Sequence, residues 1–150
     1  MSVSDDESGI SIGGVFRHVV QMRWGDLDAL NHLNNAMYFR YLEEARMQMF
    51  MRCGRSPDRL GVLAHVSCDF LRPLLYPADV VISLTLTRIG RTSMAFDTRF
   101  ERLDEPGTLY AQGHNVIVGT SAATGRPTPW TAEELAGLRA LLEPGGETGG

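Results

Sequence analysis

The chain has 150 residues and a mass of 16.5 kDa, a size that suits a single domain able to bury most of the surface its unfolded form exposes. Its net charge of −4 and pI near 5.5 argue against a broad nucleic-acid-binding surface, which needs a basic face. No apolar run approaches the ~20 residues that span a bilayer, and the acidic, polar start is unlike a secretory signal. The sequence therefore predicts a cytoplasmic protein with neither a nucleic-acid nor a membrane partner.

The first expected elements are a strand over Val15–Trp24 and a helix over Ala36–Met51, in which apolar residues recur at helical spacing. Asn34 or Asn35 can cap the start of this helix, and Gly54 is the expected stop. Residues 1–14 and 143–150 hold too little apolar surface to offset chain entropy. We expect a disordered leader and a flexible tail around one domain over residues 15–142.

Four segments of strand character follow, with hairpin signals at "IGRT" and "DEPG". They are Val62–Leu71, Asp79–Ile89, Thr92–Arg102 and Thr108–Thr120. A short last helix is expected from Thr131, because "TAEE" has the form of a capping box. One long helix cannot cover both faces of a five-stranded sheet, so the exposed face or edge should receive a partner chain.

The cysteines and histidines give no sign of a metal or redox centre. Cys53 and Cys68 lie far apart, outside any CxxC arrangement, and we interpret both as reduced packing residues. The histidines lack the spacing that brings two ligands to one metal; they are His18, His32, His65 and His114. The sequence therefore predicts no metal site and no resident cofactor.

Two stretches carry a family resemblance. "DLDALNHLNNAMYFRYLEEAR" resembles the pattern D-x-D-x-x-G-H-V-N-N-x-x-Y-x-x-Y-x-E-x-A-R, and "FLRPLLYPADVVI" resembles a second signature of the same family. Together with the element order, they are similar to the hotdog-fold acyl-CoA thioesterases of the 4-hydroxybenzoyl-CoA thioesterase type. The resemblance implies an α+β hotdog fold, in which a long central helix is wrapped by a five-stranded antiparallel sheet. It also implies a homodimer with a continuous sheet, active sites at the dimer interface, and a homotetramer of two dimers.

The resemblance also implies the roles of three groups in front of the helix. Asp28 would be the base or nucleophile, and the backbone N–H of Asn35 would polarise the thioester carbonyl with the help of the helix dipole. His32 would be a second catalytic group or would orient the loop. From residue type alone, the same cluster is also typical of a turn-rich, capped helix entry, with Asp26 as a loop residue. Asn31 stands where the family often has glycine, and asparagine is the residue that best replaces glycine at positive φ.

Further positions are candidates for contact with the substrate, of which coenzyme A is a part. Asn34, which also suits the cap, and Tyr38 belong to the first motif, while Thr92 and Ser93 could place a hydroxyl near the pantetheine or the attacking water. Three arginines near turns could meet the nucleotide phosphates, although solvated surface arginines are the commoner explanation there; they are Arg88, Arg91 and Arg126.

Two other functions remain open at this stage. A hotdog hydratase or dehydratase would need a histidine and an acid over the α and β carbons, which His32 and a helix glutamate could supply. Glu44 is the helix carboxylate we consider, although it can also form a surface pair with Arg40. A non-catalytic acyl-CoA-binding protein would use the same pocket. The acyl group, and the choice between coenzyme A and acyl carrier protein as its carrier, are not predicted by the sequence.

Overall fold

The computed structural model describes residues 10, 12–54 and 56–144. The expected leader over 1–14 and tail over 143–150 therefore fall mostly outside the described residues. Within the leader, however, Ile10 is buried in the core, and the Gly13 N–H donates to the Leu86 carbonyl at 2.8 Å. The packed part of the chain thus begins before Val15.

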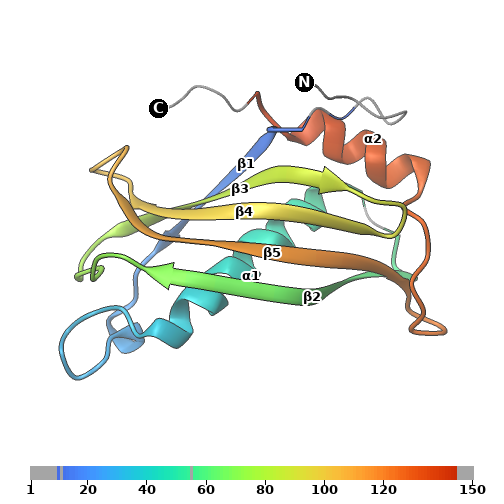
Figure 1. Ribbon diagram of the computed structural model, residues 1–150. Helices are drawn as coiled ribbons and strands as arrows, with labels where there is room; N and C mark the ends of the chain where they lie inside the picture. The colour runs from blue at the N-terminus through green and yellow to red at the C-terminus, as the bar shows by residue number, and fades with distance from the viewer. Residues whose placement is uncertain (1–9, 11, 55, 145–150) are drawn as a thin grey trace.

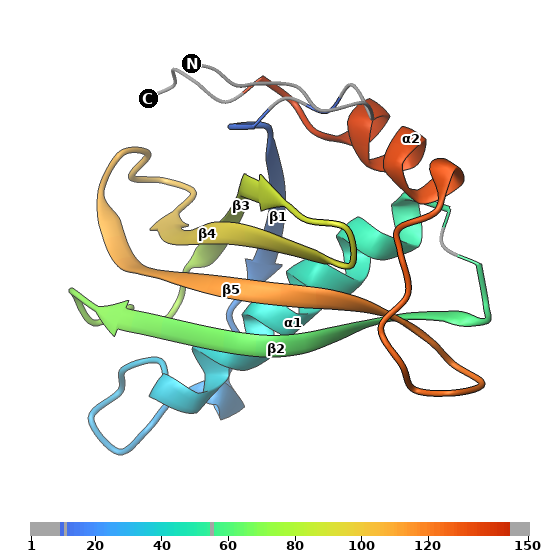
Figure 2. The ribbon, with the colours of Figure 1, turned by 45° about the vertical axis from the view of Figure 1, so that its right-hand side comes forward.

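Five antiparallel strands form one sheet in the order β1-β3-β4-β5-β2. They are β1 (Val15–Gln21), β2 (Arg59–Phe70), β3 (Asp79–Ile89), β4 (Ser93–Arg102) and β5 (Leu109–Ser121). Figures 1 and 2 show the sheet curving around helix α1 (Asn35–Arg52), while α2 (Ala132–Leu141) lies near the C-terminal end of α1. The expected α+β class, with one helix wrapped by a five-stranded antiparallel sheet, is confirmed.

Helix α1 is built by its apolar spacing and by its caps. The Asn34 side chain accepts a hydrogen bond from the Ala36 N–H at 3.0 Å, so Asn34 is the cap and Asn35 the first helical residue. At the other end Gly54 adopts φ +74°, the left-handed conformation that stops a helix, as expected. The buried stripe that faces the sheet consists of Tyr38, Tyr41, Leu42, Ala45 and Met49.

Helix α2 begins with the expected capping box. The Thr131 hydroxyl accepts from the Glu134 N–H at 3.0 Å, and the Glu134 carboxylate accepts from the Thr131 N–H at 2.9 Å. The helix packs tightly on the end of α1, because a Cβ at Gly137 would lie 2.2 Å from the Cys53 carbonyl oxygen. Neither helix of the described chain has both the length and the apolar character that a membrane span requires.

Two strand boundaries differ from the expected ones by three residues, and the others differ by one residue at most. The first strand ends at Gln21 rather than Trp24, because the chain then turns into a short 3-10 segment, Trp24–Asp26. Strand β2 begins at Arg59 rather than Val62. Arg59 is buried through a bidentate ion pair with Glu134 of α2, at 3.0 and 3.1 Å, and this long-range contact leaves no local signal.

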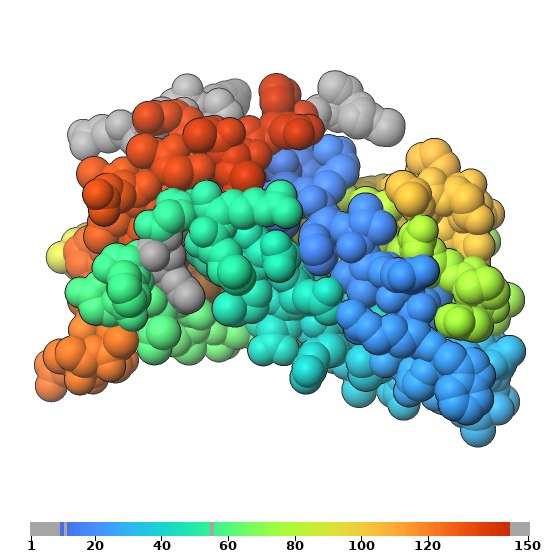
Figure 3. Space-filling model, turned by 180° about the vertical axis from the view of Figure 1, so that it is seen from behind, coloured from blue at the N-terminus to red at the C-terminus, as the bar shows by residue number. Residues whose placement is uncertain are grey.

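Strand β2 also lacks the buried face that its alternating sequence predicts. On the face toward α1, Leu63 is 37% exposed and Phe70 is 40% exposed in the single chain, and the bulge between Leu63 and His65 puts Val62, 45% exposed, on the opposite face. The reason is position, since β2 is an edge strand and has a neighbour, β5, on one side only. Seen from behind in Figure 3, α1 itself forms part of the outer surface of the chain. An apolar edge and an uncovered helix flank therefore lie next to each other.

Candidate active site

The loop in front of α1 is a tight turn closed by Asp28. Its Oδ1 accepts hydrogen bonds from the N–H groups of Leu30 at 2.9 Å and His32 at 3.1 Å. Its backbone N–H donates to the His32 carbonyl at 2.8 Å, and its carbonyl accepts from the Asn31 N–H at 3.0 Å. Asn31 has φ +68°, so the asparagine adopts the left-handed conformation expected for this position.

Contacts on both sides hold this turn against the body of the protein. The Leu33 N–H donates to the Leu74 carbonyl at 2.9 Å, and the Asn34 N–H donates to the Asp26 carbonyl at 3.0 Å. The Asp26 carboxylate accepts from the Tyr41 hydroxyl at 2.5 Å. Asp26 is therefore engaged in holding the loop on α1, in keeping with its expected role as a loop residue.

A hollow of about 200 Å³ opens beside the turn and brings four of the candidate residues together. Asp28, His32, Asn35 and Tyr38 line one side. The other side is the end of β2 and the segment after it, from Phe70 to Pro73. We call this hollow the Asp28 pocket.

Two polar groups in the Asp28 pocket are available to a ligand. Both recorded hydrogen bonds to the Asp28 carboxylate go to Oδ1, and within the described residues Oδ2 has none. The N–H of Asn35 is the first of α1 and has no hydrogen-bond acceptor among the described residues. The next two N–H groups of the helix, those of Ala36 and Met37, both donate to Asn34. The pocket thus combines a carboxylate oxygen with an amide at the positive end of a helix dipole.

Tyr38 forms the inner wall of the pocket. Its ring contacts Phe70 and Phe100 edge-on, with centroids 4.9 and 5.3 Å away. Burial raises the pKa of Tyr38 to about 12. The side chain is therefore a neutral phenol at physiological pH and lines the pocket without adding charge.

Arg72 lines the same pocket but was not singled out from the sequence. The N–H groups of Leu71 and Arg72 both donate to the Tyr110 carbonyl, at 2.9 and 3.1 Å, which fixes the backbone at this point. The sequence does contain a signal for Arg72, because Arg72 and Pro73 form the Arg-Pro pair of the second family signature, "FLRPLLYPADVVI". Arg72 is the cation that the described chain places in the lining of the Asp28 pocket.

The remaining substrate-binding candidates lie at the opposite end of the sheet. Arg88 donates to the Ser93 hydroxyl at 3.2 Å within the β3–β4 turn, and the Thr92 carbonyl accepts from the Gly119 N–H at 2.8 Å. Arg126 belongs to the loop after β5. Further along this loop, the Trp130 N–H donates to the Arg91 carbonyl at 3.2 Å, which ties the loop to the β3–β4 turn. We call this cluster the arginine rim; it consists of Arg88, Arg91, Thr92, Ser93 and Arg126.

The register of the sheet shows how far apart the two sites are in one chain. Ser93 pairs with Val118, which pairs with Val62 of β2, whereas the Asp28 pocket includes Phe70 of β2. The stretch of β2 from Val62 to Phe70 spans roughly 26 Å at about 3.3 Å per residue. Figure 1 shows the β3–β4 turn and the loop before α1 at opposite ends of the sheet. A single chain does not bring the arginine rim to Asp28.

Glu44, the alternative helix carboxylate, points elsewhere. Its carboxylate lies 3.7 Å from His18 of β1 and 3.7 Å from Arg23, and not in the expected ion pair with Arg40. It does not line the Asp28 pocket. The reason is the helical rotation between positions: the preceding residue, Glu43, faces β2, whereas Glu44 faces β1.

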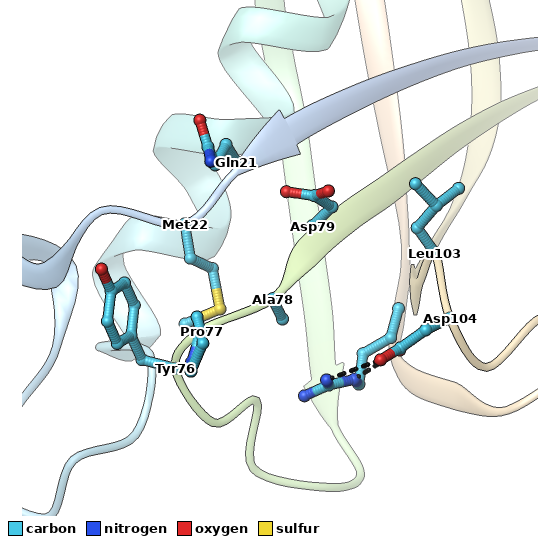
Figure 4. A pocket seen from close by; sticks show the side chains of 9 residues that line it. Gln21, Met22, Tyr76, Pro77, Ala78, Asp79, Leu103 and Asp104 are labelled. Atoms are coloured by element: carbon cyan, nitrogen blue, oxygen red, sulfur yellow. Dashed lines mark hydrogen bonds and ion pairs between the residues drawn. The ribbon is translucent and has the colours of Figure 1, made fainter.

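A larger hollow of about 400 Å³ lies at the ends of β1, β3 and β4. Figure 4 shows Met22, Tyr76 and Pro77 on one side and Leu103 and Asp104 on the other. Its cation, Arg102, is already bonded to the Asp104 carboxylate at 2.8 and 3.0 Å. Within the described residues, this hollow does not combine a carboxylate with a helix N-terminus as the Asp28 pocket does, and no cluster of three potential ligands could hold a metal ion.

Comparisons with known proteins identify the family and support the fold. Residues 22–138 match the family described as the Thioesterase-like superfamily. The uncharacterized protein YsmA of Bacillus subtilis (strain 168) is 28% identical over 122 residues, which cover 79% of this chain and 82% of YsmA.

Two solved structures are more similar in sequence. The "PA2801 protein, a putative Thioesterase from Pseudomonas aeruginosa" is 34% identical with a TM-score of 0.74, over 77% of this chain and 92% of that one. "A putative acyl-CoA thioesterase from Xanthomonas campestris" is also 34% identical, with a TM-score of 0.62, over 68% of this chain and 89% of that one.

Proposed function

Because the chain belongs to the Thioesterase-like superfamily, we propose that it hydrolyses an acyl-CoA thioester to the free acid and coenzyme A in the Asp28 pocket. One observation carries the proposal: Asp28, with one carboxylate oxygen that accepts no hydrogen bond from the described residues, and Asn35, which carries the first amide of α1, line the same hollow. The names of the two more similar structures support the choice of substrate class.

Hydrolysis of a thioester needs few protein groups besides the Asp28 carboxylate and the Asn35 N–H. The Asn35 N–H donates to the thioester oxygen, and the α1 dipole stabilises the negative charge that develops there. Asp28 Oδ2 either removes a proton from water or attacks the carbonyl carbon itself. The leaving thiol has a pKa of roughly 8.5, judged from cysteine, so it departs without a strong general acid.

His32 serves this arrangement mainly through its backbone. Its N–H donates to Asp28 Oδ1 and its carbonyl accepts from the Asp28 N–H, so it fixes the position of the carboxylate. His32 also lines the pocket, and we propose that its ring contacts the substrate or the water there. A hydratase or dehydratase would need a histidine and an acid over the α and β carbons, and Glu44, the helix carboxylate considered for it, lies beside His18 and Arg23 and does not line the pocket.

The complete site requires a second copy of the chain. Strand β2 offers an edge of 12 residues with exposed apolar side chains. The other edge, β1, is partly occupied, since Val15 exchanges two hydrogen bonds with Glu143 at 2.8 and 2.9 Å. Two β2 strands that pair antiparallel about a two-fold axis near their middle bring the partner's arginine rim to the end of β2 beside Asp28. There it can meet the nucleotide phosphates of coenzyme A.

The test is a panel of acyl-CoA and acyl carrier protein thioesters with thiol release as the readout. We expect release from at least one CoA ester, and loss of that release in Asp28→Asn. Conversion of an enoyl-CoA without thiol release would support a hydratase instead. Binding without turnover of any ester would support a non-catalytic acyl-CoA-binding protein.

A further inference from the structure

A groove of about 330 Å³ runs between α1 and β2, next to the Asp28 pocket. Phe39, Arg40, Glu43 and Arg46 of α1 form one wall, and Leu63 and Val66 of β2 form the other. The Phe39 and Phe70 rings meet edge-on, 6.4 Å apart, and Phe70 lines the Asp28 pocket. The groove is therefore the next hollow along α1 for an acyl group whose thioester is held at Asp28.

A buried amide lies directly behind the β2 wall of this groove. Asn115 of β5 pairs with Val66 on one side and with Phe96 of β4 on the other. Directly paired residues in antiparallel strands point to the same face of the sheet, with Cβ atoms about 5 Å apart. Because Phe96 faces the core under α1, Asn115 and Val66 face α1 as well.

Asn115 has no hydrogen-bond partner in the described chain. It is 0% exposed, and both its side-chain oxygen and its side-chain nitrogen are unpartnered. The Thr98 hydroxyl, on the same face and one row closer to Tyr38, is also buried and unpartnered. Buried polar groups in native proteins are nearly always bonded, because an unpaired one costs about 1–3 kcal/mol. Three unpaired atoms in one place call for a partner from outside the described chain, either a group of a ligand or a bound water.

We propose that the side chains of Asn115 and Thr98 form hydrogen bonds with an oxygen atom of the acyl group. The preferred substrates are then acyl thioesters with a hydroxyl or carbonyl group remote from the thioester. This inference rests on the proposed function. On β5, the residues on this face between Asn115 and the Tyr38 wall are Gly113 and Ala111, so no large side chain of that strand blocks the path. The amide can both donate to and accept from such a group, and the Thr98 hydroxyl can do the same.

The test uses two ester pairs that differ by one hydroxyl: phenylacetyl-CoA with 4-hydroxyphenylacetyl-CoA, and hexanoyl-CoA with 6-hydroxyhexanoyl-CoA. We expect kcat/KM of the wild type to favour the hydroxylated member of at least one pair by about tenfold or more. Asn115→Leu and Thr98→Val should each reduce this ratio. Ser83→Ala, at a buried polar position on the opposite face of the sheet, should retain it.

Two further measurements separate the inference from its alternatives. Binding of each ester to Asp28→Asn, measured by calorimetry, should show the same preference, so the inference can be judged even if no ester is hydrolysed. Thermal unfolding without ligand should show that Asn115→Leu is as stable as the wild type or more stable, since it removes an unpaired amide. Equal kcat/KM and equal affinity within both pairs would overturn the inference. A marked loss of stability in Asn115→Leu would show that the amide instead binds a structural water.

Discussion

Asp28 uses its two carboxylate oxygens differently, and this division shapes the most direct test. Oδ1 closes the turn, whereas Oδ2 accepts no hydrogen bond from the described residues, and Asp28 lines the pocket. Asn in its place retains an oxygen for the turn but loses the charge. We expect Asp28→Asn to fold normally and to lower kcat by roughly 10² to 10⁴, the typical contribution of a general base, with little change in KM. Steady-state kinetics and thermal unfolding check both parts.

The matched control for Asp28→Asn is Glu44→Gln, which also removes one carboxylate charge. Its partners are His18 and Arg23, outside the Asp28 pocket, so kcat should change little. Asp26→Asn is a poorer control because it weakens the bond from Tyr41 and with it the loop. A nearly unchanged kcat in Asp28→Asn, combined with a large loss in Glu44→Gln, would contradict the loop-carboxylate mechanism.

The arginine rim makes a separate prediction about substrate binding. Arg91→Ala and Arg126→Ala should each raise KM for a CoA ester several-fold while leaving KM for the matching pantetheine ester nearly unchanged, because only CoA carries the nucleotide phosphates. Arg17→Ala removes an exposed arginine of β1 and is the control for net charge. Equal increases for both esters would show that the rim does not read the nucleotide.

At the scale of elements, the ion pair of Arg59 and Glu134 ties α2 to the start of β2. Burial raises the pKa of Glu134, but the hydrogen bonds from Arg59 and Thr131 outweigh it, so the pKa lies below its ordinary value of 4.5. A lowered pKa stabilises the fold above pH 4.5, and this contribution is lost as pH falls through the lowered value. We expect Glu134→Gln to reduce the acid dependence of the free energy of unfolding, measured with urea between about pH 6 and pH 3.

Thr131→Ala is the companion variant for Glu134→Gln. It removes the hydroxyl that caps α2 and should destabilise the protein by about 1 kcal/mol. Because the hydroxyl does not titrate, this loss should persist across the pH range with little change. If the free energy of unfolding fell with pH equally in the wild type and in Glu134→Gln, this would contradict the assignment of part of that fall to the ion pair of Arg59 and Glu134.

The sequence predicted elements well where local signals determine them. The bounds of β3, the Asn34 cap, the stop at Gly54 and the Thr131 capping box are confirmed, because each depends on residues within a few positions. The start of β2 was wrong, since it depends on a contact between Arg59 and a residue 75 positions away. The sequence predicted an exposed face or edge but did not assign it to β2, because alternation predicts a strand and not its place in the sheet.

The residues of the candidate site were likewise predicted where they lie close together in the sequence and missed where they come from distant strands. The first motif placed Asp28, His32, Asn35 and Tyr38 on one short loop and the helix it enters, and the structure brings them to one pocket. Arg72 and Asn115 come from distant strands or their ends, and no local pattern connects them with Asp28. The Arg40–Glu44 pair was wrong because Glu44 instead lies beside Arg23 and His18, groups that meet only in the folded chain.

For the whole molecule, the separation of Asp28 and the arginine rim is the fact that most constrains function. The two sites stand at opposite ends of β2, roughly 26 Å apart at about 3.3 Å per residue, within one chain. An antiparallel β2 pairing reverses the partner's strand, so its rim lies beside this chain's Asp28. Each of the two sites would then combine Asp28 of one subunit with the rim of the other. The expected homotetramer is not needed for this arrangement.

A heterodimer tests the shared site directly. One subunit carries Asp28→Asn, and the other carries Arg91→Ala with Arg126→Ala; different tags on the two allow the mixed dimer to be purified after co-expression. In a shared arrangement, one site receives both defects and the other receives none. The heterodimer should therefore retain about half of the wild-type kcat per dimer, with the KM of the wild type.

The alternative, in which each chain builds its own site, makes a different prediction for the same sample. One site then lacks Asp28, and the other contains Asp28 with a defective rim, so the remaining activity should show the raised KM of the arginine variant. KM distinguishes the two arrangements even if the yield of active protein varies, because KM does not depend on enzyme concentration. Sedimentation of the wild type at micromolar concentration is the necessary companion: a species of 16.5 kDa would contradict the shared site before any kinetics are measured.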